Sequence, residues 1–309
     1  SAAGPTCTVR QPFLRSRSVV SVLIDFHTHT TASDGALSPA ALLQRARDRD
    51  IRLLAITDHD TVAGYQAAVA QYNPSGNALR LVPGVELSCV WSGVTVHVVG
   101  LGMDCEHPVF VAGLARLAAA RTERARVIGE RLAKLGFPGA LEGALQEAGA
   151  SQVGRPHFAA WMLARGHVDS LTRAFDRYLG RGKPGDVKAF WPELAEVTAW
   201  IVQAGGVAVL AHPLKYALTR SKLRRLVADF VAAGGSAVEI LNGRQTPDQS
   251  RQLRLLALEA GLEVSAGSDF HQESSWGAEV GVELRHLGGL RGVWQRWLPP
   301  QDCPSVEVT

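Results

Sequence analysis

The feature of the sequence that most constrains the fold is an alternation of short apolar runs with helical patterns. Residues 19–26 are typical of a buried strand, and Ser38-Pro39 then supply a helix N-cap and a first-turn proline. Repeated strand–helix units indicate a parallel sheet covered by helices. About seven such units favour a barrel-like closure over an open doubly wound sheet. We therefore expect an α/β protein.

The pattern also predicts where the elements lie and where the alternation stops. We expect strands at 19–26, 52–57, 80–91, 94–100, 206–210, 237–241 and 263–266. A turn at Ser92-Gly93 should connect strands 80–91 and 94–100. We expect five helices in these units. One begins at residue 38, one spans 61–72, one follows Pro192 and ends at residue 204, and the last two span 221–233 and 246–261. Between about 108 and 178 no strand pattern occurs, and a long helical pattern at 109–135 precedes shorter helical segments.

The 309-residue length fits two domains or one large α/β unit that carries an insertion. We divide the chain into a flexible N-terminal tail at 1–20, a first barrel part at 21–104, a helical insertion at 105–190 that caps the site, and a second barrel part at 191–309. The first 24 residues contain three arginines and no acid. We interpret them as a disordered tail rather than as a targeting segment, because they lack an apolar core.

Charge and cysteine content exclude several classes of protein. The net charge of +3 is too small for a nucleic-acid coat, so any preference for anions must be local. The four cysteines lie far apart without a C-x-x-C pair, which predicts neither a thiolate zinc site nor a disulfide framework. No apolar stretch approaches the ~20 residues of a membrane span. We expect a cytoplasmic protein with reduced thiols and no membrane association.

Histidines and acids gather at the predicted strand ends. In Asp25-Phe26-His27-Thr28-His29 the alternation of an extended chain places both histidines on one face. A lone histidine at such a position is more often structural than a metal ligand. A whole group of histidines and acids at the strand ends instead favours metal binding. The candidate ligands are His27, His29, Asp34, His59, Glu86, His97, His212, Asp269 and His271. Imidazole and carboxylate without thiolate form the ligand mix of zinc, manganese or iron.

Five motifs, in this order, resemble the PHP (polymerase and histidinol phosphatase) family of the amidohydrolase superfamily. They are D-F-H-T-H-T-T-A-S-D-G, I-T-D-H-D-T, P-G-V-E-L-S, V-A-V-L-A-H-P and G-S-D-F-H, and they span residues 25–271. Within the family the chain is most similar to bacterial 3',5'-nucleoside bisphosphate phosphatases, some of which also trim short RNA from the 5' end. The resemblance implies a distorted (β/α)7 TIM-like barrel with a helical insertion.

The resemblance also implies three divalent metal ions, with Mn²⁺ expected and Zn²⁺ or Fe²⁺ fitting the same ligands. The first ion would be held by His27, His29, Glu86 and Asp269, the second by Glu86, His97 and His212, and the third by Asp34, His59 and His271. Histidinol phosphatases of the family usually have histidine where this chain has Asp34, which argues against that substrate. Three divalent ions and three carboxylates leave a formal +3, and such a pocket favours a phosphate dianion.

Basic turns in the predicted insertion supply candidate substrate contacts. Arg155 and His157 lie just before a helix, where guanidinium and N–H groups can bind phosphate oxygens. Lys183 belongs to a second basic turn, and Asn242 ends a predicted strand on the site face. Each turn could equally be a cation-rich surface loop. We expect substrate binding by all four residues, and catalytic roles for Arg155, His157 and Asp269.

These inferences lead to one main functional hypothesis and three alternatives. We expect hydrolysis of the 3'-phosphate of nucleoside 3',5'-bisphosphates, with a water activated between two ions as nucleophile. The nearest alternative is a 5'→3' exonuclease on short 5'-phosphorylated RNA or DNA. A phosphatase for another metabolite and a non-catalytic scaffold are the others. ATP-binding and serine-nucleophile motifs are absent. The expected partner is a small nucleotide or short oligonucleotide, with no obligate protein partner.

Overall fold

The computed structural model describes residues 22–72, 79–243, 245–273, 278–284 and 290–299. The predicted tail at 1–20 lies outside these residues. Within them, nine strands form a four-stranded sheet of order β3-β2-β1-β9 and a five-stranded sheet of order β4-β5-β6-β7-β8. The strands are β1 (Leu23–Asp25), β2 (Leu53–Ala55), β3 (Arg80–Val82), β4 (Gly84–Trp91), β5 (Val94–Leu101), β6 (Val207–Leu210), β7 (Ala237–Asn242), β8 (Glu263–Gly267) and β9 (Val282–Glu283).

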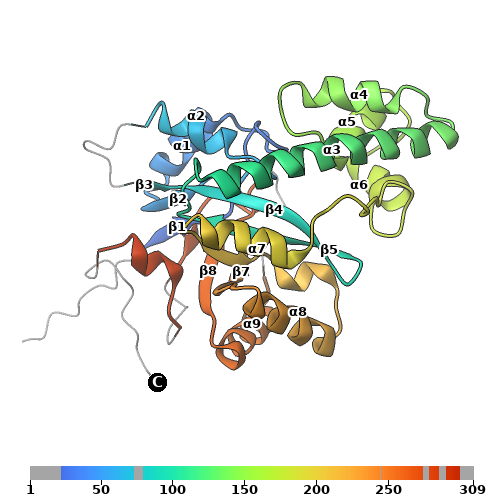
Figure 1. Cartoon of the computed structure of the whole chain (residues 1–309). Coiled ribbons are helices and arrows are strands. Elements are labelled where there is room, and N and C mark those ends of the chain that lie inside the picture. The colour runs from blue at the N-terminus through green and yellow to red at the C-terminus, as the bar shows by residue number, and fades with distance from the viewer. Residues whose placement is uncertain (1–21, 73–78, 244, 274–277, 285–289, 300–309) are drawn as a thin grey trace, which may run out of the picture.

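Helices surround both sheets (Figure 1). The α-helices are α1 (Pro39–Asp48), α2 (Ala63–Val69), α3 (Pro108–Lys134), α4 (Ala140–Ala148), α5 (Arg155–Ala164), α6 (Leu171–Ala174), α7 (Leu194–Gln203), α8 (Arg220–Ala232) and α9 (Pro247–Ala260). A π-helical turn, η1 (Phe175–Leu179), follows α6, and 3₁₀ turns occur at η2 (Pro213–Tyr216) and η3 (Val293–Arg296). No helix in the described part of the chain combines the length and apolar character needed to cross a membrane.

Local sequence signals explain where the helices begin and end. The Ser38 hydroxyl accepts the Ala41 N–H at 3.2 Å, so α1 begins with the predicted cap and Pro39 in its first turn. In α9, Thr246 and Gln249 form a reciprocal capping box. That helix ends at Gly261, whose φ of 65° is the left-handed conformation that glycine tolerates. These helix boundaries are confirmed.

Two expectations about the strands are wrong. The predicted strand 80–91 is divided at Pro83: β3 pairs with β2, whereas β4 pairs with β5. Proline has no N–H for a ladder and a fixed φ, which explains the break. The sheets are also mixed rather than parallel. Because β4 and β5 form the hairpin expected at Ser92-Gly93, β5 runs against both β4 and β6.

The α/β class is confirmed, whereas a closed barrel is not shown. The two sheets are connected by a few backbone hydrogen bonds and isolated bridges rather than by a paired ladder. On one side the Phe26 N–H donates to the Ala266 carbonyl at 3.1 Å, and on the other His59 forms an isolated bridge with Glu86. Both links lie near the strand ends that carry the candidate ligands. The predicted (β/α)7 barrel therefore remains a prediction, but the ends of the two sheets do meet.

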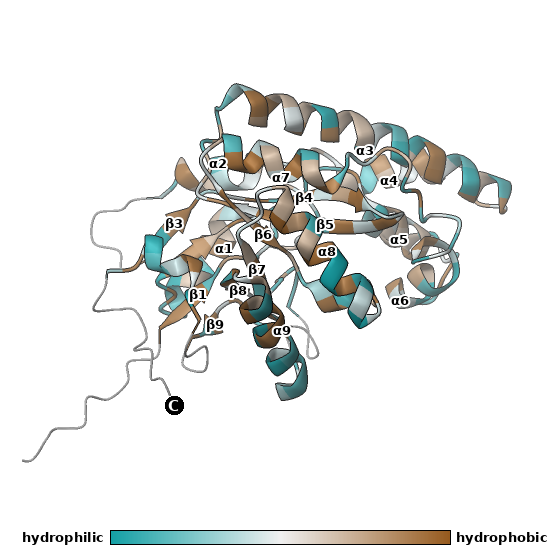
Figure 2. Ribbon diagram, turned by 60° about the horizontal axis from the view of Figure 1, so that its bottom comes forward, coloured by the Kyte–Doolittle hydropathy of each residue, from teal (hydrophilic) through white to brown (hydrophobic). Residues whose placement is uncertain are grey.

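The helices α3 to α6 have their own hydrophobic cluster. Ile128, Leu132, Phe158 and Met162 belong to it, and each is fully buried. The first half of α3 instead contributes Phe110 to the larger cluster around the sheets. Figure 1 shows α4, α5 and α6 gathered at the far end of α3. Figure 2 shows strands that are largely hydrophobic and helices that carry hydrophilic residues among the hydrophobic ones. The domain boundaries remain a prediction.

Candidate active site

The buried carboxylate of Asp25 joins the end of β1 to the segment that follows β8. It accepts the Ser268 hydroxyl at 2.6 Å and N–H at 2.8 Å, and the Gly281 N–H at 2.7 Å. Burial raises the pKa of Asp25 to about 6, against these hydrogen bonds. The same tie sets Asp269 beside the histidines after β1, with its Oδ1 3.4 Å from His27 Nε2 and 3.3 Å from His29 Nε2.

Glu86 on β4 stands at the centre of the site, 1% exposed. Five imidazole nitrogens lie 2.8–3.3 Å from its two oxygens, and they belong to His27, His29, His59, His97 and His212. Burial alone would raise the pKa of the Glu86 carboxyl, but the histidines His59, His97 and His27 hold it well below its ordinary range.

This arrangement fits bound cations. The ring atoms His27 Nε2, His29 Nε2 and His59 Nδ1 and the Oε2 atom of Glu86 are all buried. None of them has a hydrogen-bond partner among the described residues. Buried polar atoms are normally satisfied, and five protonated imidazoles in one buried cluster would repel one another. Neutral imidazoles present lone pairs to the same space as the carboxylate, which is the donor set of a divalent transition metal.

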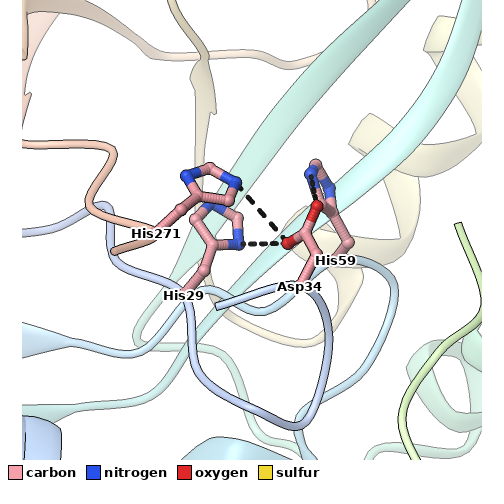
Figure 3. Close-up of side chains that lie close together, drawn as sticks. All are labelled: His29, Asp34, His59 and His271. Atoms are coloured by element: carbon pink, nitrogen blue, oxygen red, sulfur yellow. Dashed lines mark ion pairs between the residues drawn. The ribbon is translucent and has the colours of Figure 1, made fainter. Parts of the chain in front are cut away.

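A second group surrounds the carboxylate of Asp34 (Figure 3). Its oxygens lie 3.7 Å from His29 Nδ1, 3.8 Å from His59 Nε2 and 3.5 Å from His271 Nε2. The loop that presents Asp34 is held by Asp58, which accepts the Thr30 N–H and hydroxyl, both at 2.7 Å. Burial alone would raise the pKa of Asp34. The neighbouring histidines outweigh this effect, so the pKa of Asp34 lies below its ordinary value.

All nine predicted ligands therefore come together, in three groups whose donor atoms lie within 4.8 Å of one another, with His212 adjoining through Glu86. Two groups contain the predicted first and third sets, with His29 added to the third. The remaining group joins Glu86 and His97 to His59, whereas the prediction joined them to His212. The assignment of each ligand to an ion remains a prediction.

The backbone is strained at three strand ends in the site. Asp60, His212 and Asp269 have φ values of 56°, 29° and 56°, in the left-handed region that side chains other than glycine rarely adopt. Such conformations persist where the surroundings hold them, and they are frequent at functional sites. Here the strain turns His212 and Asp269 toward the cluster.

Sequence reasoning missed Glu239, a buried acid on β7. One of its oxygens lies 2.9 Å from His27 Nδ1, and the other accepts the His212 N–H at 2.7 Å. An ionised carboxylate can only accept, so Nδ1 of His27 is the donor to Glu239, and Nε2 is the ring atom that would bind a cation beside Glu86. An acid inside an otherwise apolar strand run was the signal that could have revealed Glu239.

Lys215 in η2 was also missed. Its ammonium forms an ion pair with Oδ2 of Asp269, the oxygen that faces away from the His27 contact. Burial would lower the pKa of Lys215, but the charge of Asp269 outweighs it and raises the pKa. Lys215 therefore fixes the orientation of a candidate metal ligand.

A cationic surface adjoins the cluster. One cavity of about 110 Å³ is lined by Asp34, His59 and His97 together with Arg121, Arg124 and Arg155. A second, of about 330 Å³, shares His97 and Arg155 and adds Arg181, Lys188 and Lys215. Arginine is well suited to bind phosphate oxygens. Anions can thus approach the cluster from the side of the insertion.

The two arginines of α3 in this surface were not predicted. The guanidinium groups of Arg121 and Arg124 lie 5.5 and 5.1 Å from the ring centre of Trp191. Arg121 is paired with Asp60 at 2.6 Å, whereas Arg124 donates to the Val187 carbonyl at 2.8 Å. Burial and the charges of its two arginine neighbours lower the pKa of Arg124, so a bound anion would relieve an existing repulsion.

The predicted substrate contacts have different surroundings. Arg155 lines both cationic cavities and donates to the Leu179 carbonyl at 3.1 Å. His157 accepts the Gly154 N–H on Nδ1 at 3.0 Å, and its Nε2 lies 3.3 Å from the Ser151 hydroxyl. Lys183 is exposed and is not among the residues that line these cavities. Asn242 lines a third cavity, beside His212.

Comparisons of the sequence agree with this geometry. Residues 25–134 match the family model of the PHP domain. The chain is 44% identical to the 5'-3' exoribonuclease Rnm of Escherichia coli, over 93% of this chain and 98% of that protein. It is 40% identical to a 3',5'-nucleoside bisphosphate phosphatase of Chromobacterium violaceum, over 90% of this chain and 99% of that protein.

Solved structures show the same architecture. An amidohydrolase from Chromobacterium violaceum with bound sulfate superposes with a TM-score of 0.80 at 38% identity, over 88% of this chain and 95% of that chain. A protein from Bifidobacterium adolescentis assigned as a metal-dependent phosphoesterase gives 0.72 at 30% identity, over 82% and 90%. These matches extend over nearly the whole chain, and the acids and histidines of the site cluster as described above. The chain therefore belongs to the PHP domain family, a family of metal-dependent phosphoesterases.

Proposed function

We propose that this chain hydrolyses the 3'-phosphate of nucleoside 3',5'-bisphosphates, such as adenosine 3',5'-bisphosphate. The observation that supports this most strongly is the pair of cationic cavities that begin at the Glu86 cluster. A cluster able to hold divalent cations suits one phosphate, and guanidinium groups beside it suit a second phosphate of the same molecule.

In this proposal the nine clustered residues hold three divalent cations. The sets are His27, His29, Glu86 and Asp269, then Glu86, His97 and His212, then Asp34, His59 and His271. When bound, such ions supply Lewis acidity toward phosphoryl oxygens and toward water. We propose Mn²⁺, and Zn²⁺ and Fe²⁺ share its ligand preferences.

The other residues of the site bind and orient. Arg155, with Arg121 and Arg124 beside it, would neutralise oxygens of the phosphate that is not cleaved. Asp269, held by Lys215, keeps one oxygen turned toward His27 and His29. Water adds to phosphorus, the bond between phosphorus and O3' breaks, and the ribose oxygen takes a proton, which gives a 5'-nucleotide and inorganic phosphate.

His157 is proposed here as a positioning residue. Both of its ring nitrogens already have partners inside the insertion, in Gly154 and Ser151. The bond to Gly154 fixes the first turn of α5, from which Arg155 projects. Its predicted part in proton delivery requires the ring to leave both partners and stays a prediction.

The alternative activity breaks the same bond. A 5'→3' exonuclease that releases a 5'-nucleotide also cleaves between phosphorus and the O3' of the first nucleotide, and the phosphorus then carries a further nucleoside. The relatives named as an exoribonuclease and as a bisphosphate phosphatase have similar identity to this chain, 44% and 40%. Because the same bond breaks in both reactions, the two substrates differ only in what is attached to the scissile phosphate: nothing in the bisphosphate, and a further nucleoside in the oligonucleotide.

A parallel assay tests the proposal. The Mn²⁺-loaded chain is given adenosine 3',5'-bisphosphate and a 5'-phosphorylated short RNA, and inorganic phosphate and mononucleotides are measured. We expect phosphate from the first substrate and its loss after treatment with a chelator. Mononucleotides from the RNA without phosphate from the bisphosphate would make the nuclease the primary activity, and no product from either would refute both.

A further inference from the structure

A third cavity next to the cluster differs in chemistry from the cationic ones. It has a volume of about 290 Å³ and lies among β7, η2 and α9. His212 and Lys215 form its end near the cluster, and the amide side chains of Asn242, Gln245 and Gln249 line it further out. Lys215 also lines the larger cationic cavity, so the two cavities meet beside Asp269.

The three amides are held in fixed orientations. The carbonyl oxygen of Gln245 accepts the Asn242 N–H, and that of Gln249 accepts the Thr246 N–H at 2.9 Å. The amide nitrogen of Asn242 donates to Glu239 at 3.0 Å. Each of these amides is thus left with one unused end: an NH₂ group on each glutamine and the carbonyl oxygen on the asparagine.

These unused ends have no partner among the described residues. Asn242 is 7% exposed, and its Oδ1 is buried without a hydrogen bond. A buried oxygen left unsatisfied costs about 1–3 kcal/mol, which a ligand that donates to it would recover. For the two glutamine NH₂ groups, no hydrogen bond occurs within the described part of the chain.

Two donors and one acceptor around an apolar wall match the edge and face of a nucleobase. Leu214 and Leu253 supply the apolar wall. Asparagine and glutamine amides are common partners of base edges, whereas a phosphate would favour cations. Lys215, at the cluster end, is the one cation that lines this cavity in the described part of the chain.

We propose that this cavity binds the base of the nucleotide that follows the scissile phosphate in a 5'-phosphorylated dinucleotide or short RNA. The proposal rests on the proposed function and names a substrate that the same centre would also take. Water adds to phosphorus, the bond to O3' of the first nucleotide breaks, and that oxygen gains the proton. The second nucleoside keeps the phosphate as its 5'-phosphate. A nucleoside bisphosphate has no second base and leaves this cavity unused.

Replacing Gln249 by glutamate tests the subsite and keeps the capping box of α9. Gln249→Glu keeps the oxygen that accepts the Thr246 N–H and removes the NH₂ donor. Gln252→Glu, on the same helix but lining a different cavity, introduces the same charge and serves as the matched control. For each variant, kcat/KM is measured on adenosine 3',5'-bisphosphate and on 5'-phosphorylated diadenylate.

We expect Gln249→Glu to lower kcat/KM for the dinucleotide about tenfold more than for the bisphosphate, as loss of one hydrogen bond to the base implies. The control should change both values equally. Equal loss on both substrates with Gln249→Glu would place the cavity at the first nucleotide, and no loss on either would show that no base enters it. Either result overturns the proposal.

A binding measurement separates this proposal from the proposed function. Calorimetry uses a diadenylate whose scissile O3' is replaced by CH₂, and the matching mononucleotide analogue without the second nucleoside. The unsubstituted chain should bind the dinucleotide analogue more tightly, and Gln249→Glu should remove that advantage. If neither natural substrate is hydrolysed but this difference persists, the proposed function fails and the subsite stands. Equal binding of both analogues would overturn the subsite.

Discussion

The acid–histidine cluster and the arginines of the insertion border one cavity, but the protein builds them differently. Glu86 lies within the paired strand β4 and is 1% exposed, so the backbone ladder fixes its position. Arg124 and Arg155 project from helices, and they donate hydrogen bonds to the main-chain carbonyls of Val187, between η1 and α7, and of Leu179, in η1. Strands and their ends thus hold the candidate metal ligands, whereas helices hold the arginines that we propose to bind the substrate's phosphate.

This difference predicts that substitutions in the cluster should affect metal content and turnover, while substitutions in the insertion should affect substrate binding. Glu86→Gln should have the largest effect, because it removes the charge shared by five histidines. We expect kcat/KM to fall by roughly 10³-fold or more, with the loss of bound metal. Elemental analysis and phosphate release measure this. The exposed Glu142→Gln is the control, and normal metal content in Glu86→Gln would contradict the assignment.

Glu239→Gln should have the next largest effect. It keeps the shape of the side chain but weakens its hold on His27 and His212. Second carboxylates of this kind contribute about 10- to 100-fold in metal affinity or activity. Titration of the metal-free chain with Mn²⁺, followed by activity, gives the apparent affinity. Unchanged affinity would show that the cluster does not depend on this support.

Arg155→Ala tests the insertion side of the comparison. Loss of a charge-assisted bond to phosphate should cost about 2 kcal/mol, or roughly 30-fold in kcat/KM, mainly through KM. Arg173→Ala, an exposed arginine in the same region, should have no such effect. Unchanged catalytic efficiency on adenosine 3',5'-bisphosphate would remove Arg155 from the scheme, and a fall in kcat with bound metal lost would mean that the two regions are not separate.

His157→Ala should have the smallest effect on turnover, because the ring already bonds Gly154 and Ser151. The free energy of unfolding should fall by about 1 kcal/mol through loss of the cap. Denaturant unfolding and kcat together decide the role. A fall in kcat in the range of about 10²–10⁴, typical of a general acid, would restore the proton donor predicted from the sequence.

Many candidate ligands could be predicted from local sequence patterns, whereas the residues that surround and orient them could not. His27 and His29 share a face because side chains alternate along an extended chain. The partners Glu239 and Lys215 lie more than 180 residues from His27 in the sequence. The acid in an apolar strand run marks Glu239 as unusual, but no local pattern shows which histidines it contacts. Arg124 was hidden in a long helical pattern, where arginines usually face solvent. The break at Pro83 was readable, because proline interrupts a ladder.

The sequence by itself determined the nine candidate ligands and the order in which they occur, because helix caps, strand periods and motif spacing are local properties of the chain. Tertiary structure alone decided that five imidazoles share Glu86, that β5 runs against its neighbours and that three amides turn their unused ends into one cavity. Those outcomes depend on which distant strands and loops pack together, and long-range packing is encoded only in the sum of many weak contacts.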